Sequence, residues 1–410
     1  MTRNRARYAR VWIWISGIVA GMLGVQPMGR AEAWRTRPAF PTGMIYYARP
    51  TLVWPIEVRG AGRITSVQMS LNGRTVPADY SEAKHQALYT PLRAFSAGDY
   101  RVHCRVMING RVPVDENWQF QVAANARAEL PAPDAAQRSA WETANAIRAA
   151  AGLPALTLDA RLCYAALLHA RYLALNHQSA HDEEAGRPGY VASTPSARVQ
   201  LYGYGEGSAE DVSYGPESAN EQVHGLFDAP YHRRPFLQPG SPDFGVGHVA
   251  VYTTLEFGIS GGEADSVWPY DGQTNVPVVW EPVEWPDPLR LYSDRQPSGR
   301  AYDEYRTVRG KTFHRHVGPK PVGYPITLFH YSDGPGRLAV RSATLTDPAG
   351  KAVTCYVNTP ANDDHLPDGV ILMARSPLRP NTIYTATVQA AADGRDISRT
   401  WRFTTAAVRL

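Results

Sequence analysis

Hydrophobic and polar residues alternate in short runs over residues 51–122. The runs lie at 64–71, 100–106 and 118–122, and the turn pairs between them are Asn72-Gly73, Ala97-Gly98 and Asn109-Gly110. A period of two, interrupted by glycine-containing turns, is typical of short antiparallel strands. The pattern therefore predicts a small Ig-like β-sandwich over 34–123.

The hydrophobic spacing changes after an Ala- and Pro-rich stretch at 124–136, which we interpret as a linker. Apolar residues then recur at three- and four-residue steps, which predicts a helix over 139–151 that ends at Gly152. A second helix is expected from Asp159, an N-cap candidate, to His177. Two amphipathic helices in succession mark the start of a different kind of domain.

A third helix is expected over 218–229, because its first residues resemble a capping box and Pro230 ends it. Strand-like runs follow at 245–247 and 249–257. Helices followed by strands indicate an α+β domain, which we place at 137–258.

The last zone, 259–410, begins rich in proline and then alternates again, and its end mirrors that of the first sandwich. Trp118-Gln119-Phe120-Gln121-Val122 corresponds to Trp401-Arg402-Phe403-Thr404-Thr405, and Tyr100 and Tyr384 precede the two tryptophans by 18 and 17 residues. Each tyrosine follows a turn, as in a tyrosine corner, where the phenol hydrogen-bonds back to the turn. We therefore expect a second Ig-like β-sandwich at 259–410.

Composition excludes two broad classes. With 10% aromatic, 44% hydrophobic and 20% charged residues, the chain has the composition of packed globular domains rather than of a disordered protein. Residues 1–33 hold five arginines and one acid, which accounts for the whole formal charge of +4. Because residues 34–410 are then neutral, their charge gives no reason to expect a nucleic-acid partner.

The N-terminal segment has the features of a signal peptide. Four arginines precede an apolar stretch at 11–25, and Ala31-Glu32-Ala33 is a small-x-small cleavage pattern. The apolar stretch is shorter than the roughly 20 residues that a spanning helix needs. We predict cleavage after Ala33 and a secreted or extracytoplasmic protein without a transmembrane span in the mature chain; an uncleaved membrane anchor is the alternative.

In the α+β domain, three polar residues are the best candidates for a site: His181 after the second helix, Glu210 in Ala209-Glu210-Asp211, and His232 before Arg233-Arg234. His169, His177 and His224 are assigned to structure or to solvent. The sequence contains no Gly-x-x-x-x-Gly-Lys, His-Glu-x-x-His or Cys-x-x-Cys motif, so the familiar phosphate, zincin and thiol chemistries are not indicated.

The order of these motifs resembles that of the CAP superfamily (cysteine-rich secretory proteins, antigen 5, pathogenesis-related 1), and especially its bacterial SCP-like branch. The matching segments are 145–148, 152–156, 168–170, His181, 203–204, 210–215, 226–237 and 245–247. They follow the family's order, and the match as a whole covers about 120 of the 410 residues. The flanking zones are similar to bacterial Ig-like modules.

The resemblance implies a multidomain α+β and all-β protein in which a central α-β-α sandwich, the CAP fold, lies between two Ig-like β-sandwiches. It also implies a cleft lined by His181, Glu210 and His232, which some family members use to bind zinc or another divalent metal. Glu210 would then be a metal ligand or the catalytic group that orients or deprotonates water. One departure is Ala229, which stands where many members have a second cleft glutamate.

We expect an exported bacterial CAP-domain protein of the cell envelope or the outside of the cell. Its cleft would bind a cell-wall, lipid or protein ligand, and its sandwiches would act as spacers or adhesion surfaces. A metal-dependent hydrolase acting on peptide or cell-wall material is one alternative. A structural surface or spore component with a vestigial cleft is another, and whether the protein is an enzyme is left open.

Overall fold

The fold is that of a computed structural model. It describes residues 33–407 apart from 206, 241, 260–262, 283, 293–301, 309–310, 318–320 and 333–337. The expected signal peptide, up to residue 32, lies outside the described residues. The chain forms two compact units. The first holds the described part of Met1–Trp141 with Leu158–Ala219 and Asp243–Ile259, and the second holds Glu142–Thr157, Asn220–Pro242 and Ser260–Leu410.

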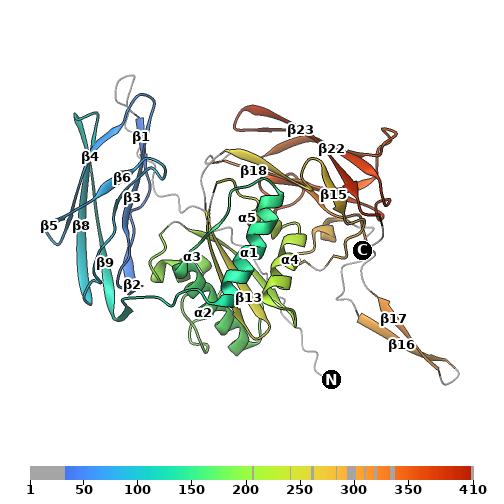
Figure 1. The fold of residues 1–410 in the computed structure, drawn as a ribbon, viewed down its shortest axis with the longest axis horizontal. Coiled ribbons are helices and arrows are strands. Elements are labelled where there is room, and N and C mark those ends of the chain that lie inside the picture. Colours follow the sequence, from blue (N-terminus) through green and yellow to red (C-terminus); the bar gives the residue numbers. More distant parts are fainter. Residues whose placement is uncertain are drawn as a thin grey trace, which may run out of the picture. The chain divides into compact units, whose positions relative to one another are not determined.

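Two sheets form the N-terminal part of the first unit (Figure 1). One has the order β1-β3-β7-β6, formed by Ala33–Thr36, Leu52–Arg59, Gln86–Tyr89 and Asp79–Ser81. The other has the order β2-β9-β8-β4-β5, formed by Gly43–Tyr47, Val112–Arg127, Gly98–Ile108, Ile64–Leu71 and Arg74–Val76. Buried side chains of both sheets, such as Trp54 and Cys104, belong to one core. A two-sheet sandwich is thus present where the alternating pattern predicts strands.

The predicted similarity between the two β-rich ends is confirmed in the register of their last hairpins. Tyr100 lies opposite Phe120, and Tyr384 lies opposite Phe403, with ring centroids 5.1 Å and 5.8 Å apart. The Tyr100 hydroxyl donates to the backbone oxygen of Ser96 at 2.9 Å. The Tyr384 hydroxyl accepts from the backbone N–H of Arg379, also at 2.9 Å. In both hairpins the phenol therefore fixes the turn before the strand.

The helices of the middle region lie close to their predicted places. They are α1 (Ala135–Ala150), α2 (Ala160–Asn176), α3 (Pro195–Leu201), α4 (Ala219–Asp228) and α5 (Arg233–Phe236). Asp159 caps α2 as predicted, and His177 ends it in the left-handed conformation. The short α3 is not predicted from periodicity. β9 continues to Arg127, so only 128–134 of the expected linker lack regular structure.

The middle region also holds a four-stranded sheet, which α2 covers on one face. The sheet has the order β10-β12-β13-β11, formed by Thr157–Leu158, Asp243–Val249, Tyr252–Gly258 and Ser208–Tyr214. A Cβ added at Gly245 or Gly247 would lie 2.2 Å from a backbone atom of α2. Only glycine allows the helix to approach this strand so closely, which gives the physical reason for the Gly-Val-Gly motif.

The second unit contains α4, α5 and the C-terminal sheets (Figure 1). One sheet has the order β14-β18-β21-β20, formed by Ala264–Trp268, Ile326–Tyr331, Gly369–Ala374 and Cys355–Asn358. Another has the order β15-β23-β22-β19, formed by Gln273–Val276, Arg395–Thr405, Ile383–Ala392 and Ala339–Thr346. The two-stranded β16-β17 (Tyr302–Val308, Lys311–Val317) and the 3-10 helix η1 (Pro288–Leu291) complete the described elements. Every residue of β18 and β21 is buried, so these strands form the centre of the module.

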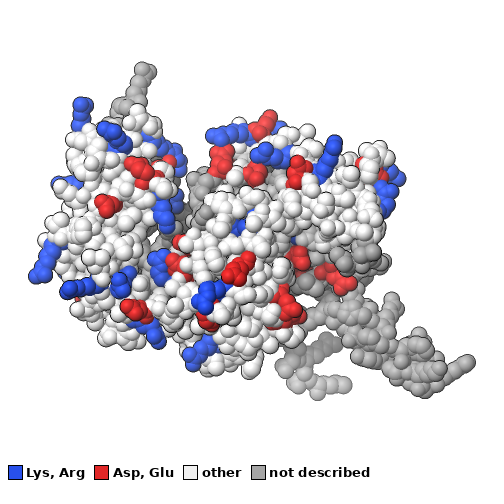
Figure 2. All heavy atoms as spheres, in the orientation of Figure 1, with Lys and Arg blue, Asp and Glu red and all other residues white. Residues whose placement is uncertain are grey.

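Charged side chains lie on the surface as mixed groups. On the face that Figure 2 draws, basic and acidic residues are interspersed. Exposed pairs such as Arg341–Asp396 stabilise a fold little, because water and salt screen them. None of the helices in the described ranges is long and apolar enough to cross a membrane.

Candidate functional site

His181 and Glu210, two of the three predicted site residues, are in direct contact in the first unit. His181 lies in the loop that follows α2, and 24% of its side chain is exposed. Glu210 lies on β11, and 1% of its side chain is exposed. His181 Nδ1 and Glu210 Oε1 are 2.9 Å apart. The pair therefore places an imidazole near the surface, above a buried carboxylate.

Arg198 holds both members of this pair. It lies on α3, which Thr194 caps by accepting a hydrogen bond from the backbone of Ala197 at 3.3 Å. The Arg198 side chain is fully buried, and its Nη2 donates to Glu210 Oε2 at 2.5 Å and to the backbone oxygen of His181 at 2.9 Å. Because one guanidinium binds the carboxylate and the histidine backbone, the geometry of the pair is fixed.

A second buried pair, His169 and Glu183, supports the loop that carries His181. His169 Nε2 donates to the backbone oxygen of Ala180 at 3.0 Å, since a carbonyl only accepts. Its Nδ1 lies 2.9 Å from Glu183 Oε1, while Glu183 Oε2 accepts from the backbone of Val191 at 2.6 Å. The loop is thus tied to α2 on both sides of His181, and His169 has the structural role expected from the sequence.

A third glutamate, Glu256, lies beside Glu210. The two residues are opposite each other on β13 and β11. The Glu256 side chain is fully buried, and neither of its oxygens has a hydrogen-bond partner among the described residues. Burial raises the pKa of Glu256 well above the usual carboxyl value, and the negative charge of Glu210 raises it further. Both effects favour the protonated, neutral form of Glu256.

Glu210 has the opposite protonation state. Burial alone would raise the pKa of its carboxyl, but the positive charge of Arg198, together with His169 and His181, lowers it well below the usual value. Glu210 is therefore ionised, and its weak affinity for protons makes it a poor general base.

His232, the third predicted site residue, pairs with a glutamate of the second unit. Its side chain is 16% exposed, and its Nδ1 lies 2.7 Å from Oε1 of the fully buried Glu284. The same oxygen accepts from the backbone N–H groups of Tyr231 at 2.8 Å and of His232 at 3.0 Å. Ala229, where many family members have a second glutamate, is buried and offers no carboxylate. That His181, Glu210 and His232 line one cleft stays a prediction.

The metal that the resemblance implies fits these residues in part. Each histidine has a carboxylate at Nδ1, and an outer carboxylate of this kind commonly orients a metal-binding imidazole. Glu210 fits less well, because a metal ion at its oxygens would compete with Arg198. The residues therefore suit imidazole ligation better than the carboxylate ligation expected for Glu210.

One group of residues in the second unit has the spacing of a metal site: Asp363, Asp364 and His365, whose ligand atoms lie within 4.8 Å of one another. The Nη2 atom of Arg290 lies 2.8 Å, 3.2 Å and 2.7 Å from ligand atoms of the three residues. A guanidinium already supplies the positive charge there. The cluster is therefore only a weak candidate for a metal site.

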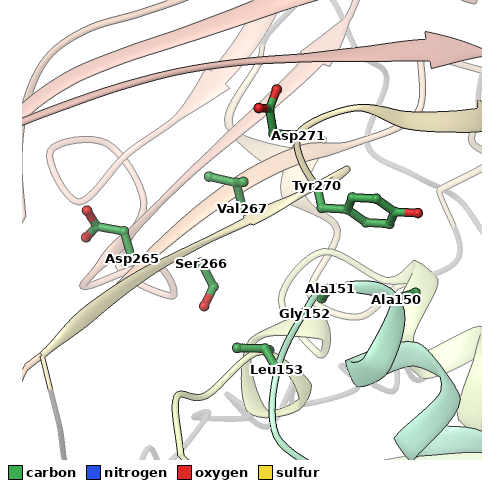
Figure 3. Close-up of a pocket in the computed structure, with 9 residues that line it drawn as sticks. All are labelled: Ala150, Ala151, Gly152, Leu153, Asp265, Ser266, Val267, Tyr270 and Asp271. Atoms are coloured by element: carbon green, nitrogen blue, oxygen red, sulfur yellow. The ribbon is translucent and has the colours of Figure 1, made fainter.

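A hollow of about 370 Å³ lies elsewhere in the second unit, between the end of α1 and β14 (Figure 3). Two of its polar side chains already have partners: the Ser266 hydroxyl donates to the backbone oxygen of Leu237, and Asp265 binds His330 and Arg399. None of the predicted site residues lines it. We therefore do not assign the site to this hollow.

The fold defines a mixed α+β protein with paired histidines and glutamates in both compact units. The sequence model described as "CAP: Cysteine-rich secretory protein family" matches residues 141–257. The chain therefore contains a CAP domain, as the order of its motifs indicates.

Several solved structures are similar to parts of the chain. An extracellular protein with an SCP domain from Bacillus anthracis str. Ames is 13% identical, with 63% of this chain and 100% of that chain covered and a TM-score of 0.28. A cysteine-rich secretory protein from Staphylococcus aureus is 12% identical, with 55% and 83% covered and a TM-score of 0.24. An outer surface protein from Borrelia burgdorferi is 17% identical, with 32% and 98% covered and a TM-score of 0.27. None of the curated proteins matches the chain.

Sequence reasoning missed four residues of these sites: Glu183, Arg198, Glu256 and Glu284. The sequence could have pointed to Glu256, because it is a charged residue inside the hydrophobic run 249–257. No sequence pattern points to Arg198 or Glu284, since each reaches its partner through tertiary contacts that no local motif encodes.

Proposed function

We propose that the protein acts outside the cytoplasm and that its CAP domain binds a ligand rather than carrying out fast catalysis. The observation that carries this proposal is the state of Glu210, whose two oxygens bind His181 and Arg198. An ionised carboxylate held in this way gives a rigid polar surface. It is poorly suited to remove a proton from water, because its pKa lies well below the usual value.

The proposed cleft is lined by His181, Glu210 and His232. Imidazole edges exposed by 24% and 16% offer hydrogen bonds to a polar ligand, which we place in the cell-wall, lipid or protein class. The predicted export signal supports a position at the envelope or beyond it, and the two β-rich modules, which we take as Ig-like, would serve as spacers or adhesion surfaces.

A cysteine pair tests whether the histidines share a hollow. In the double variant H181C/H232C, a short bifunctional thiol reagent should join the two positions within one chain. The control H224C/H232C has the same number of new thiols, with one on the exposed face of α4. Equal cross-linking of both variants, or none in the first, would refute a common cleft.

The second candidate is a metal-dependent hydrolase, which the carboxylate at Nδ1 of each histidine favours. In this candidate, His181 and His232 would hold a divalent ion, and the ion would activate water for attack on a peptide or cell-wall bond. Glu210 would orient His181 instead of binding the metal.

Zinc titration followed by a wall-binding assay separates the two candidates. We expect no stoichiometric zinc in the purified protein, and we expect H181A/H232A to lose binding to isolated cell wall or lipid. The control H177N/H224A changes two exposed histidines and should bind as the original protein does. Stoichiometric zinc that H181A/H232A loses would favour the hydrolase. Wall binding that survives in H181A/H232A would move the functional surface to the sandwiches or leave the cleft vestigial.

A further inference from the structure

We propose that Glu284, which lies outside the CAP match at 141–257, is a positioning residue that sets the tautomer and the orientation of His232. The C-terminal module would then complete the site instead of acting only as a spacer. The inference rests on the proposed function in one respect, which is that it takes His232 as a site residue.

The tautomer follows from the donors around one oxygen. Glu284 Oε1 accepts from the backbone N–H groups of Tyr231 and His232, which can only donate. An oxygen that accepts two such bonds does not itself carry a proton. The contact of 2.7 Å to His232 Nδ1 is therefore an N–H donated by the ring. In neutral His232, the lone pair then lies on Nε2.

Glu284 forms its hydrogen bonds with the segment that carries His232. Its side chain is fully buried, and within the described part of the chain its three hydrogen bonds come from residues 231 and 232. Its second oxygen, Oε2, has no hydrogen-bond partner among the described residues. Burying a carboxylate so incompletely bonded costs stability, and a group with a purely structural role normally has both oxygens satisfied.

Further contacts keep His232 in reach of Glu284. The Tyr324 hydroxyl donates to Asp228 Oδ1 at 2.9 Å, before the histidine in the chain. After it, Arg233 Nη1 donates to the backbone oxygen of Pro325 at 2.9 Å, and Arg234 Nε donates to Asp368 Oδ1 at 2.9 Å. The C-terminal module thus holds the chain on both sides of His232. These contacts keep the His232 ring next to the Glu284 carboxylate.

The test is the tautomer of His232, read from its imidazole ¹⁵N shifts in the full chain at a pH where the ring is neutral. The variant H232Q identifies its signals among the twelve histidines. We expect the Nδ1–H form in the original protein and in E284Q, because a glutamine oxygen accepts the same bonds. In E284A we expect a shift to the Nε2–H form, which a free histidine side chain prefers. His181, held by Glu210, is an internal control, and E281A, at an exposed position of the same segment, should change nothing.

An Nε2–H ring in the original protein would overturn the proposal, and so would an Nδ1–H ring that persists in E284A. The first of these outcomes does not depend on E284A, so it remains decisive if E284A does not fold. A purely structural Glu284 would lower the melting temperature in E284A without changing the tautomer. The tautomer of His232 can be measured even if the protein binds none of the proposed ligands. Failure of the proposed function can therefore be told apart from failure of the proposed role of Glu284.

Discussion

At the scale of single residues, the His181 site is organised by one buried cation. Arg198 lies 2.5 Å from Glu210 and 3.8 Å from Glu183, and Glu256 lies opposite Glu210 in the sheet. One guanidinium cannot balance three buried negative charges in a medium of low dielectric. In the fold, the raised pKa of Glu256 favours its protonated form, while the lowered pKa of Glu210 keeps that carboxyl ionised.

The variant E256Q tests whether Glu256 is protonated in the folded protein. In the unfolded chain, Glu256 loses its proton near pH 4.3, whereas in the fold it keeps the proton to higher pH. Between these two values the unfolded state binds fewer protons, so the stability of the original protein falls as pH rises. Glutamine cannot ionise. We therefore expect equal stability near pH 4 and a gain for E256Q of about 1 kcal/mol or more near pH 8, measured by urea unfolding. A loss of stability at both pH values would contradict a neutral Glu256.

A double-mutant cycle tests whether Glu210 and Glu256 share the guanidinium of Arg198. In E210Q the cation loses its closest carboxylate, which would cost about 3–5 kcal/mol if nothing replaced it. Glu256 can replace it by ionising, because the charge that raised its pKa is gone. We expect E210Q to lose less than that range at pH 7, and E210Q/E256Q to lose more than the sum of the single variants. Additive losses would show that the two glutamates do not share the guanidinium.

At the scale of elements, local signals predicted the parts of the fold that local chemistry determines. The limits of α2 follow from Asp159 and His177, which cap it, and the hairpin register of Tyr100 follows from the turn before it. The short α3 has too few turns to show a period, so the position of Arg198 could not be predicted. Glu284 reaches His232 from 52 positions away, and only packing brings such residues together.

The glycines of β12 provide a test at this scale. A Cβ at Gly247 would lie 2.2 Å from the backbone of Leu167, so G247A must push α2 away from the sheet. We expect G247A to lose about 1–3 kcal/mol or more in chemical denaturation. In G225A, the control on α4, the new methyl group meets nothing within 4 Å. That variant should gain about 0.5–1 kcal/mol, because alanine favours the helix. A neutral G247A would mean that the close approach is not required.

At the scale of the molecule, the compact units cut across the segment that matches the CAP family. Residues 142–157 and 220–242 pack with the C-terminal sheets, while the rest of 141–257 belongs to the first unit. Arg148 illustrates the packing inside the second unit: its buried guanidinium donates to backbone oxygens of Phe236, Gln238 and Gly240. A sequence read in linear order predicts modules one after another, and it contains no signal for contacts of this range.

Hydrogen exchange in the variant R233M tests whether α4 and the C-terminal sheet unfold together. The buried side chain of Arg233 donates to the backbone oxygens of Phe227, at the end of α4, and Pro325, before β18. Methionine keeps the volume but removes both bonds, and bonds to a charged donor are worth about 1.5–3 kcal/mol each. We expect faster amide exchange in α4 and β18 to the same degree, with no change in the N-terminal strands β8 and β9.

R341M removes an exposed arginine of the same unit and should leave α4 and β18 unchanged. Faster exchange in α4 alone would mean that the segment carrying His232 opens without the C-terminal sheet, and that the sheet does not hold the site in place.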